Sequence, residues 1–287
     1  MAQFDPTALP RPRPVVLVVL DGWGHRAEKT PDNAILAART PVIDAPFQHM
    51  VLDGLWPAAD YPALLRALPA DAFYRPLKHS DALLPDGRSA RLQFPMLPEN
   101  IERLPHGPRA FWMDVAQAVC APRVMDAWKQ RFAPVLERVA GRPVAGIRLR
   151  PYATLFRDIG GYRISIHPDS PRKAITTQYY LPADDSQTHL GTVFHTRRDD
   201  GGYDTARTMR FAPNSGYAFA VSPVSYHSVE KMHDTDKPRN SLMVIISYDR
   251  GPLVEGMKSA QKRLRAWYDR ARGIAPIEAG EGKVESM

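Results

Sequence analysis

The chain has 287 residues, of which 44% are hydrophobic and 24% are charged. These are ordinary values for a folded globular protein, and they exclude a disordered or fibrous chain. The 28 prolines are scattered rather than periodic, so we expect plentiful loops and few long helices. The net charge of +7 is spread without a dense basic run, which argues against nucleic-acid binding and favours an anionic substrate.

Other composition features limit the compartment and the kind of metal site. The longest apolar run, residues 15–20, is too short to cross a bilayer, and the first residues lack the apolar core of a signal peptide. We therefore expect a cytoplasmic protein with no membrane partner. Cys120 is the only cysteine, so neither an internal disulfide nor a cysteine cage for metal can form. Any metal must be held by histidine and carboxylate.

The first half of the chain changes character near residue 45. A buried strand (VVLVVLDG) and a short helix (PDNAILAARTPVIDA) are predicted within residues 1–45, which we treat as a leader segment. Short helical stretches such as YPALLRALP and RAFWMDVAQAVC follow, and they predict helical support over residues 46–140.

The second half is typical of a β-protein. Eight β-branched and aromatic segments separated by turn residues occupy residues 145–250, and an amphipathic helix and polar tail are predicted over 251–287. This pattern predicts a mainly β fold with flanking helices, in the form of a sandwich or jelly roll. We take residues 46–250 as the main domain.

Polar residues at the ends of these predicted strands suggest a metal site. His167 and Asp169 are two apart in ISIHPD, and the two-residue period of a strand turns both side chains to one face. His227 lies in a later strand, followed by Arg239 and Ser241 on the last one. Two imidazoles and one carboxylate form the facial triad that holds iron(II) with open coordination positions.

A carboxylate site is predicted beside the metal. The guanidinium of Arg239 suits a carboxylate in bidentate fashion, and Ser241 points to the same side of its strand. The alternative interpretation of Arg239 is a residue on the surface of the strand.

The ordered pattern HxD, distal His and RxS resembles the iron(II)- and 2-oxoglutarate-dependent oxygenase family, in particular its prolyl-hydroxylase-like branch. The resemblance implies a double-stranded β-helix, which is a cupin-like jelly roll. It also implies hydroxylation of a substrate by dioxygen, with 2-oxoglutarate converted to succinate and carbon dioxide. The ligands of iron would be three residues: His167, Asp169 and His227.

The same resemblance assigns the cosubstrate contacts. Arg239 would bind the distal carboxylate of 2-oxoglutarate, with Ser241 assisting. Tyr180, in the YYL segment, bonds that carboxylate in some relatives. The alternative interpretation of Tyr179 and Tyr180 is simple strand alternation, with one ring buried and the other exposed.

A second resemblance concerns residues 12–45, where LDGWG and the following segment are similar to the start of cofactor-independent phosphoglycerate mutases. The family would make Asp21 a metal ligand. Its GNSEVGH-type serine motif does not occur in this chain, so phosphoryl transfer lacks its covalent carrier. Two alternatives to the oxygenase stay open: a mutase-like metal-dependent phosphotransferase and a non-catalytic jelly-roll binding protein.

Overall fold

A computed structural model describes residues 40–249, except 57 and 78. The predicted strand and most of the predicted helix of the leader, and the predicted C-terminal helix, lie outside the described residues. Among the described residues, none of the helices has the length and apolarity that a bilayer crossing requires.

The described chain alternates short helices and strands before it becomes a run of strands. The helices are α3 (Tyr61–Arg66), α4 (Pro98–Ile101), α5 (His106–Val119), α6 (Pro122–Arg131) and α7 (Ala133–Ala140). The strands are β1 (His49–Asp53), β2 (Arg75–Pro76), β3 (Arg91–Pro95), β4 (Leu149–Asp158), β5 (Ile164–His167), β6 (Lys173–Tyr180), β7 (Thr192–Arg197), β8 (Tyr203–Thr208), β9 (Ser215–Ala220), β10 (His227–Val229) and β11 (Arg239–Tyr248).

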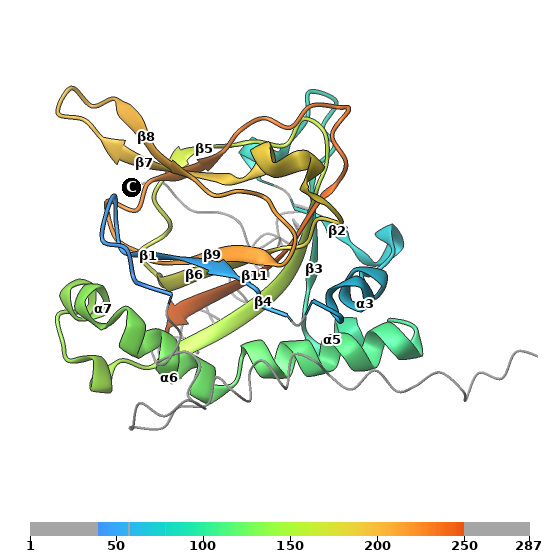
Figure 1. Cartoon of the computed structure of the whole chain (residues 1–287), viewed down its shortest axis with the longest axis horizontal. Helices are drawn as coiled ribbons and strands as arrows, with labels where there is room; N and C mark the ends of the chain where they lie inside the picture. Colours follow the sequence, from blue (N-terminus) through green and yellow to red (C-terminus); the bar gives the residue numbers. More distant parts are fainter. Residues whose placement is uncertain (1–39, 57, 78, 250–287) are drawn as a thin grey trace, which may run out of the picture.

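These strands form two facing antiparallel sheets (Figure 1). The larger sheet has the order β1-β9-β6-β11-β4-β3-β2, and the smaller has the order β5-β10-β7-β8. Consecutive strands such as β4, β5, β6 and β7 alternate between the two sheets, as a jelly roll requires. The predicted mainly β, jelly-roll fold is therefore confirmed.

Two details differ from the sequence prediction. Residues 46–140 were expected to be helical support, but β1 and β3 from this region pair with β9 and β4 and extend the larger sheet. One of the eight β-segments predicted from the sequence is TMRFAP, residues 208–213, whereas the strand there is β8, which ends at Thr208. The two deviations share a cause: burial does not alternate strictly along β1 and β3, and five of the six residues of β8 are exposed, so these strands lack the period-2 pattern on which the prediction depends.

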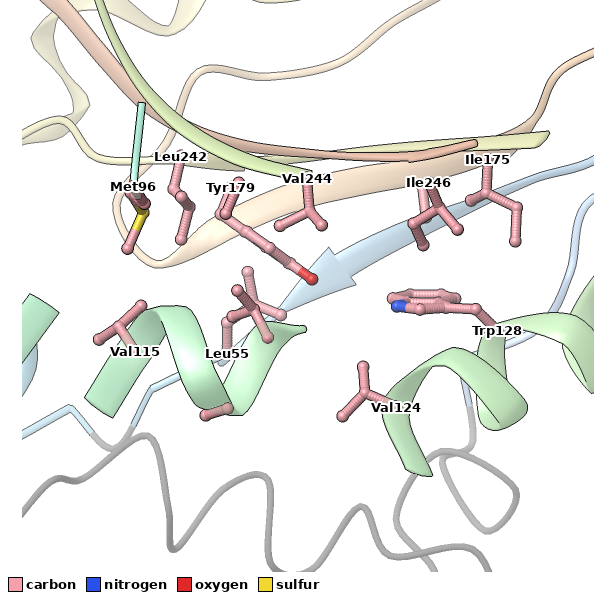
Figure 2. Close-up of a cluster of buried hydrophobic side chains, with 14 of the residues drawn as sticks. Leu55, Met96, Val115, Val124, Trp128, Ile175, Tyr179, Leu242, Val244 and Ile246 are labelled. Atoms are coloured by element: carbon pink, nitrogen blue, oxygen red, sulfur yellow. The ribbon is translucent and has the colours of Figure 1, made fainter. Parts of the chain in front are cut away.

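The helices cover the outer face of the larger sheet (Figure 1). On β11, Leu242, Val244 and Ile246 are buried and alternate with residues that face the other sheet. These side chains belong to one apolar cluster with the helices: Ile246 lies opposite Trp128 of α6, and Leu242 lies toward Val115 of α5 (Figure 2). This core holds the helices against the outer face of the larger sheet.

A second core lies between the two sheets. It is rich in aromatic rings, among them Tyr162, Tyr180, Phe194, Tyr217 and Phe219. Several polar and charged side chains are buried beside these rings, and because buried polar groups are costly unless they are paired, their position indicates the functional interior of the roll.

Candidate active site

The three predicted metal ligands converge at one end of the smaller sheet. His167 is the last residue of β5, and His227 is the first residue of β10 and its direct cross-strand partner. Asp169 follows Pro168 in the turn that leads to β6. One potential ligand atom from each of the three residues lies within 4.8 Å of the others.

Both histidines are held in the orientation that metal binding needs. The Nδ1–H group of His167 donates to the carbonyl oxygen of Ser165 at 2.8 Å, and that of His227 donates to the carbonyl oxygen of Ser225 at 3.0 Å. Because a carbonyl can only accept, Nδ1 carries the proton in each ring and Nε2 keeps its lone pair. A backbone partner of this kind commonly orients a metal-bound histidine.

Asp169 is buried and prepared to be an anionic ligand. Thr176 Oγ1 donates to Asp169 Oδ2 at 2.6 Å, and the Lys173 ammonium contacts Asp169 Oδ1. Burial alone would raise the pKa of Asp169, but the charge of Lys173 and the hydrogen bonds from Lys173 and Thr176 hold it well below its usual range. The carboxylate form, which binds metal, is therefore strongly favoured.

Burial also keeps His227 neutral. It lowers the pKa of His227 to about 4, although the neighbouring Asp169 acts in the opposite direction. A neutral imidazole is the form that coordinates a metal. The donor set of two histidines and one carboxylate fits iron(II), which is the metal typical of it.

Arg239 lies deep between the sheets rather than on the surface. Its side chain is fully buried, so the surface interpretation is wrong. Its Nε–H group donates to the carbonyl oxygen of Leu190 at 2.7 Å, and Nη1 donates to Asp158 Oδ2 at 2.8 Å. A long 3.4 Å contact joins Nη2 to Thr192 Oγ1. The guanidinium also interacts with the hydroxyl of Tyr180.

Tyr179 and Tyr180 alternate across β6, but neither ring is exposed. Tyr179 points to the helices (Figure 2), whereas Tyr180 belongs to the core between the sheets. The two rings point to opposite faces of the strand, as expected. The expected exposure of one ring is wrong, because helices cover the outer face of this sheet. Tyr180 lies below the Arg239 guanidinium, 5.3 Å from ring centroid to Cζ, and its hydroxyl donates to Thr192 Oγ1 at 3.1 Å.

Ser241 is on the same face of β11 as Arg239 but contacts a different group. Its Oγ accepts a hydrogen bond from Gln178 Nε2 at 2.9 Å, and Gln178 Oε1 accepts one from the Tyr217 hydroxyl at 2.6 Å. Tyr217 in turn contacts Thr192 Oγ1 at 3.0 Å. Ser241 therefore belongs to a hydrogen-bonded chain that leads back to Arg239 through Thr192.

Sequence reasoning missed several buried groups of this interior. His49 on β1 is fully buried, donates from Nδ1 to the carbonyl oxygen of Phe47 at 2.8 Å, and has no partner for Nε2 among the described residues. Asp158 and Arg91 lie beside Arg239. No motif marks these residues, and only the pairing of distant strands brings them to the site.

Comparison with known proteins yields short sequence matches and weak structural ones. No known family profile matches the chain. The 2,3-bisphosphoglycerate-independent phosphoglycerate mutase of Idiomarina loihiensis is 46% identical over 56 residues, which are 18% of this chain and 11% of that protein. The Synechococcus sp. enzyme is 51% identical over 53 residues, 17% of this chain and 10% of that protein. The chain thus spans about a tenth of these relatives, and the predicted resemblance to them is confirmed.

The similar solved structures include oxygenases. A Pseudomonas putida prolyl-4-hydroxylase matches 82% of this chain and 100% of its own, with 14% identity and a TM-score of 0.46. A prolyl hydroxylase from Trichoplax adhaerens, in complex with a hypoxia-inducible-factor fragment, matches 69% of this chain and 83% of its own, with 13% identity and a TM-score of 0.42. At this level of similarity we base the functional assignment on the side chains of the site.

Proposed function

We propose that this protein is an iron(II)- and 2-oxoglutarate-dependent dioxygenase that hydroxylates a substrate. The observation that carries the proposal is the convergence of His167, Asp169 and His227, whose potential ligand atoms lie within 4.8 Å of one another. Bound iron(II) would supply the activation of dioxygen, which protein side chains cannot perform. The residues of this chain supply binding, orientation and a dry interior.

Each ligand has a supporting contact in this proposal. The carbonyls of Ser165 and Ser225 orient the two imidazoles, and Thr176 orients the carboxylate of Asp169. These three residues would hold the metal, and a donor set of this kind would allow it to bind 2-oxoglutarate as well.

Arg239 would bind the distal carboxylate of 2-oxoglutarate. Its guanidinium suits a carboxylate, and its complete burial would limit competition from water. Tyr180 and Ser241 would assist Arg239 in binding this carboxylate. The Tyr180 hydroxyl contacts Thr192 beside the guanidinium, and Ser241 holds Gln178 in the same interior. The substrate stays open, and the basic balance of the chain favours an anionic one.

Succinate release and metal binding by the full chain test this function. We expect the purified protein to bind one iron(II) per chain under anaerobic conditions and to release succinate from 2-oxoglutarate when oxygen is admitted. His167→Ala and Asp169→Ala should each abolish succinate release and leave the protein folded. His189→Ala, at a partly exposed histidine that is not in the triad, is the matched control and should behave as the wild type.

The same preparation distinguishes the alternatives. A mutase-like phosphotransferase would convert phosphoglycerates, and a binding module would release no succinate even with iron bound. Succinate formation by Asp169→Ala at the wild-type rate would refute the proposed metal site.

A further inference from the structure

Three charged residues, one of them Arg239, form a row across three neighbouring strands. Asp158 on β4 is the direct cross-strand partner of Arg239 on β11 and of Arg91 on β3. Directly paired residues in a sheet point to the same face, so the acid stands between two guanidinium groups. All three side chains are buried, with exposed fractions of 0%, 0% and 9% for Asp158, Arg239 and Arg91.

The two arginines contact Asp158 through different oxygens. Arg239 donates to Oδ2 at 2.8 Å, whereas Arg91 Nε lies 3.2 Å from Oδ1 in an ion pair whose angle is not that of a hydrogen bond. Arg91 also donates to the Tyr162 hydroxyl and stacks on Phe156, with its Cζ 4.0 Å from the ring centroid. Arg91 is thus fixed on the side of Asp158 opposite to Arg239.

The charges of this row do not cancel. Two guanidinium groups face one carboxylate, and within the described residues neither arginine has an ion pair with any other acid. The hydroxyl of Tyr162 stays neutral, because burial raises its pKa to about 12. Asp81, the next carboxylate toward Tyr162, lies at the rim and accepts from the amide of Ser165. A buried excess of one positive charge is costly unless an anion completes it.

We propose that Arg91 is a positioning residue for 2-oxoglutarate, acting through Asp158 and Arg239. Asp158 holds Arg239 in place, and the charge of Arg91 balances the charge of Asp158. The positive charge of Arg239 is then left to attract the incoming carboxylate. Without Arg91, Asp158 and Arg239 form a neutral pair, and the distal carboxylate enters a pocket with no net attraction. This inference deepens the proposed function and rests on it.

Anaerobic calorimetric titration of the metal-loaded full chain with 2-oxoglutarate tests this role. Arg91→Met removes the charge and retains an apolar stem over Phe156. We expect its Kd for 2-oxoglutarate to rise at least tenfold, about 1.4 kcal/mol, with metal affinity unchanged. In turnover, KM should rise by more than kcat falls. Arg91→Lys restores the charge and should recover affinity to within about threefold of the wild type.

A matched ligand isolates the distal carboxylate. 2-Oxopentanoate has the same chain length as 2-oxoglutarate but lacks that carboxylate, so Arg91→Met should leave its binding unchanged. The wild type and Arg91→Met are each titrated with both ligands. These four titrations form a double-mutant cycle, which gives the coupling energy between Arg91 and the distal carboxylate. Arg88→Met, at an exposed arginine with 75% of its side chain accessible, controls for the change in net charge and should have no effect.

The outcomes separate this inference from the proposed function. If the wild type does not bind 2-oxoglutarate, the proposed function fails. If the wild type binds it and Arg91→Met binds it equally well, or loses affinity for both ligands equally, the role of Arg91 is refuted. Should Arg91→Met not fold, Arg91→Gln provides the same test, since it keeps a donor for Tyr162 without the charge.

Discussion

Thr176 connects Asp169, a proposed metal ligand, to the larger sheet. It is buried on β6, and its hydroxyl donates to the carboxylate oxygen of Asp169 at 2.6 Å. Partners behind a metal ligand fix its direction and tune its affinity for the metal. The order of the candidate site therefore depends on residues that carry no part of the HxD motif.

Thr176→Val tests this connection, because valine has nearly the same shape without the hydroxyl. We expect affinity for iron(II) to fall by about 10–100-fold, measured by anaerobic titration with a competing chelator. Thr177→Val is the matched control. Thr177 is the next residue on the strand, and its hydroxyl donates to the carbonyl oxygen of Val244 instead. Equal metal affinity in the two variants would show that the Thr176 contact does not support the ligand.

Individual residues show where sequence patterns inform and where they do not. The HxD spacing predicted His167 and Asp169 as candidate ligands because the two residues lie only two positions apart in the chain. Arg91 and Asp158 carry no such signal: they are 67 residues apart in the chain, and their contact exists only because β3 and β4 pair. Their chemistry could not be predicted without the strand register.

Among the elements, β7 enters the smaller sheet through a tight passage at Gly191. A Cβ atom on Gly191 would overlap the backbone carbonyl of Met209. The backbone of Gly191 is extended, with φ −74° and ψ 167°, so any residue could adopt it and only the space requires glycine. The next residue, Thr192, donates from its amide to the Tyr180 hydroxyl at 2.9 Å.

Gly191→Ala should therefore disturb both stability and the pocket. We expect the free energy of unfolding to fall by about 1–3 kcal/mol, the usual cost of overpacking, and the affinity for 2-oxoglutarate to fall as Thr192 moves. Urea denaturation and the titration described above measure the two effects. Gly107→Ala, in helix α5, where an added Cβ meets no atom within 4 Å, should lower neither quantity, because alanine favours a helix more than glycine does. A fully stable Gly191→Ala would mean that the Met209 backbone moves aside freely.

At the scale of the molecule, residues 40–249 contain two cores with different tasks. The apolar core between the helices and the larger sheet supports the roll, whereas the core between the sheets contains the candidate site. The proposed metal ligands come from the end of β5, the loop that follows it and the start of β10, so a bound metal would join separate segments of the chain.

Metal binding should consequently stabilise the native protein. A ligand that binds only the folded state at 100 times its Kd contributes about 2.7 kcal/mol, and for a protein of this size we expect Tm to rise by about 5–10 °C. Manganese(II), which resists oxidation in air, is a suitable probe, with chelator added to reverse the shift. His227→Ala should show no such shift. A shift of the same size in that variant would place the bound metal elsewhere.

The sequence alone determined the fold class and the identity of the candidate ligands. The β-segments of residues 145–250 predicted the jelly roll because strand patterning is local, and the HxD, His and RxS spacing predicted the metal and carboxylate groups because these motifs keep their order in the chain.

Only the tertiary structure decided how these groups are supported. The pairing of β4 with both β3 and β11 places Asp158 between two arginines, and the entry of β1 into the larger sheet buries His49. The physical reason is that register and sheet order depend on the packing of the entire chain, whereas the motifs depend only on neighbouring residues. Charge balance at Arg239 is thus a property of the fold.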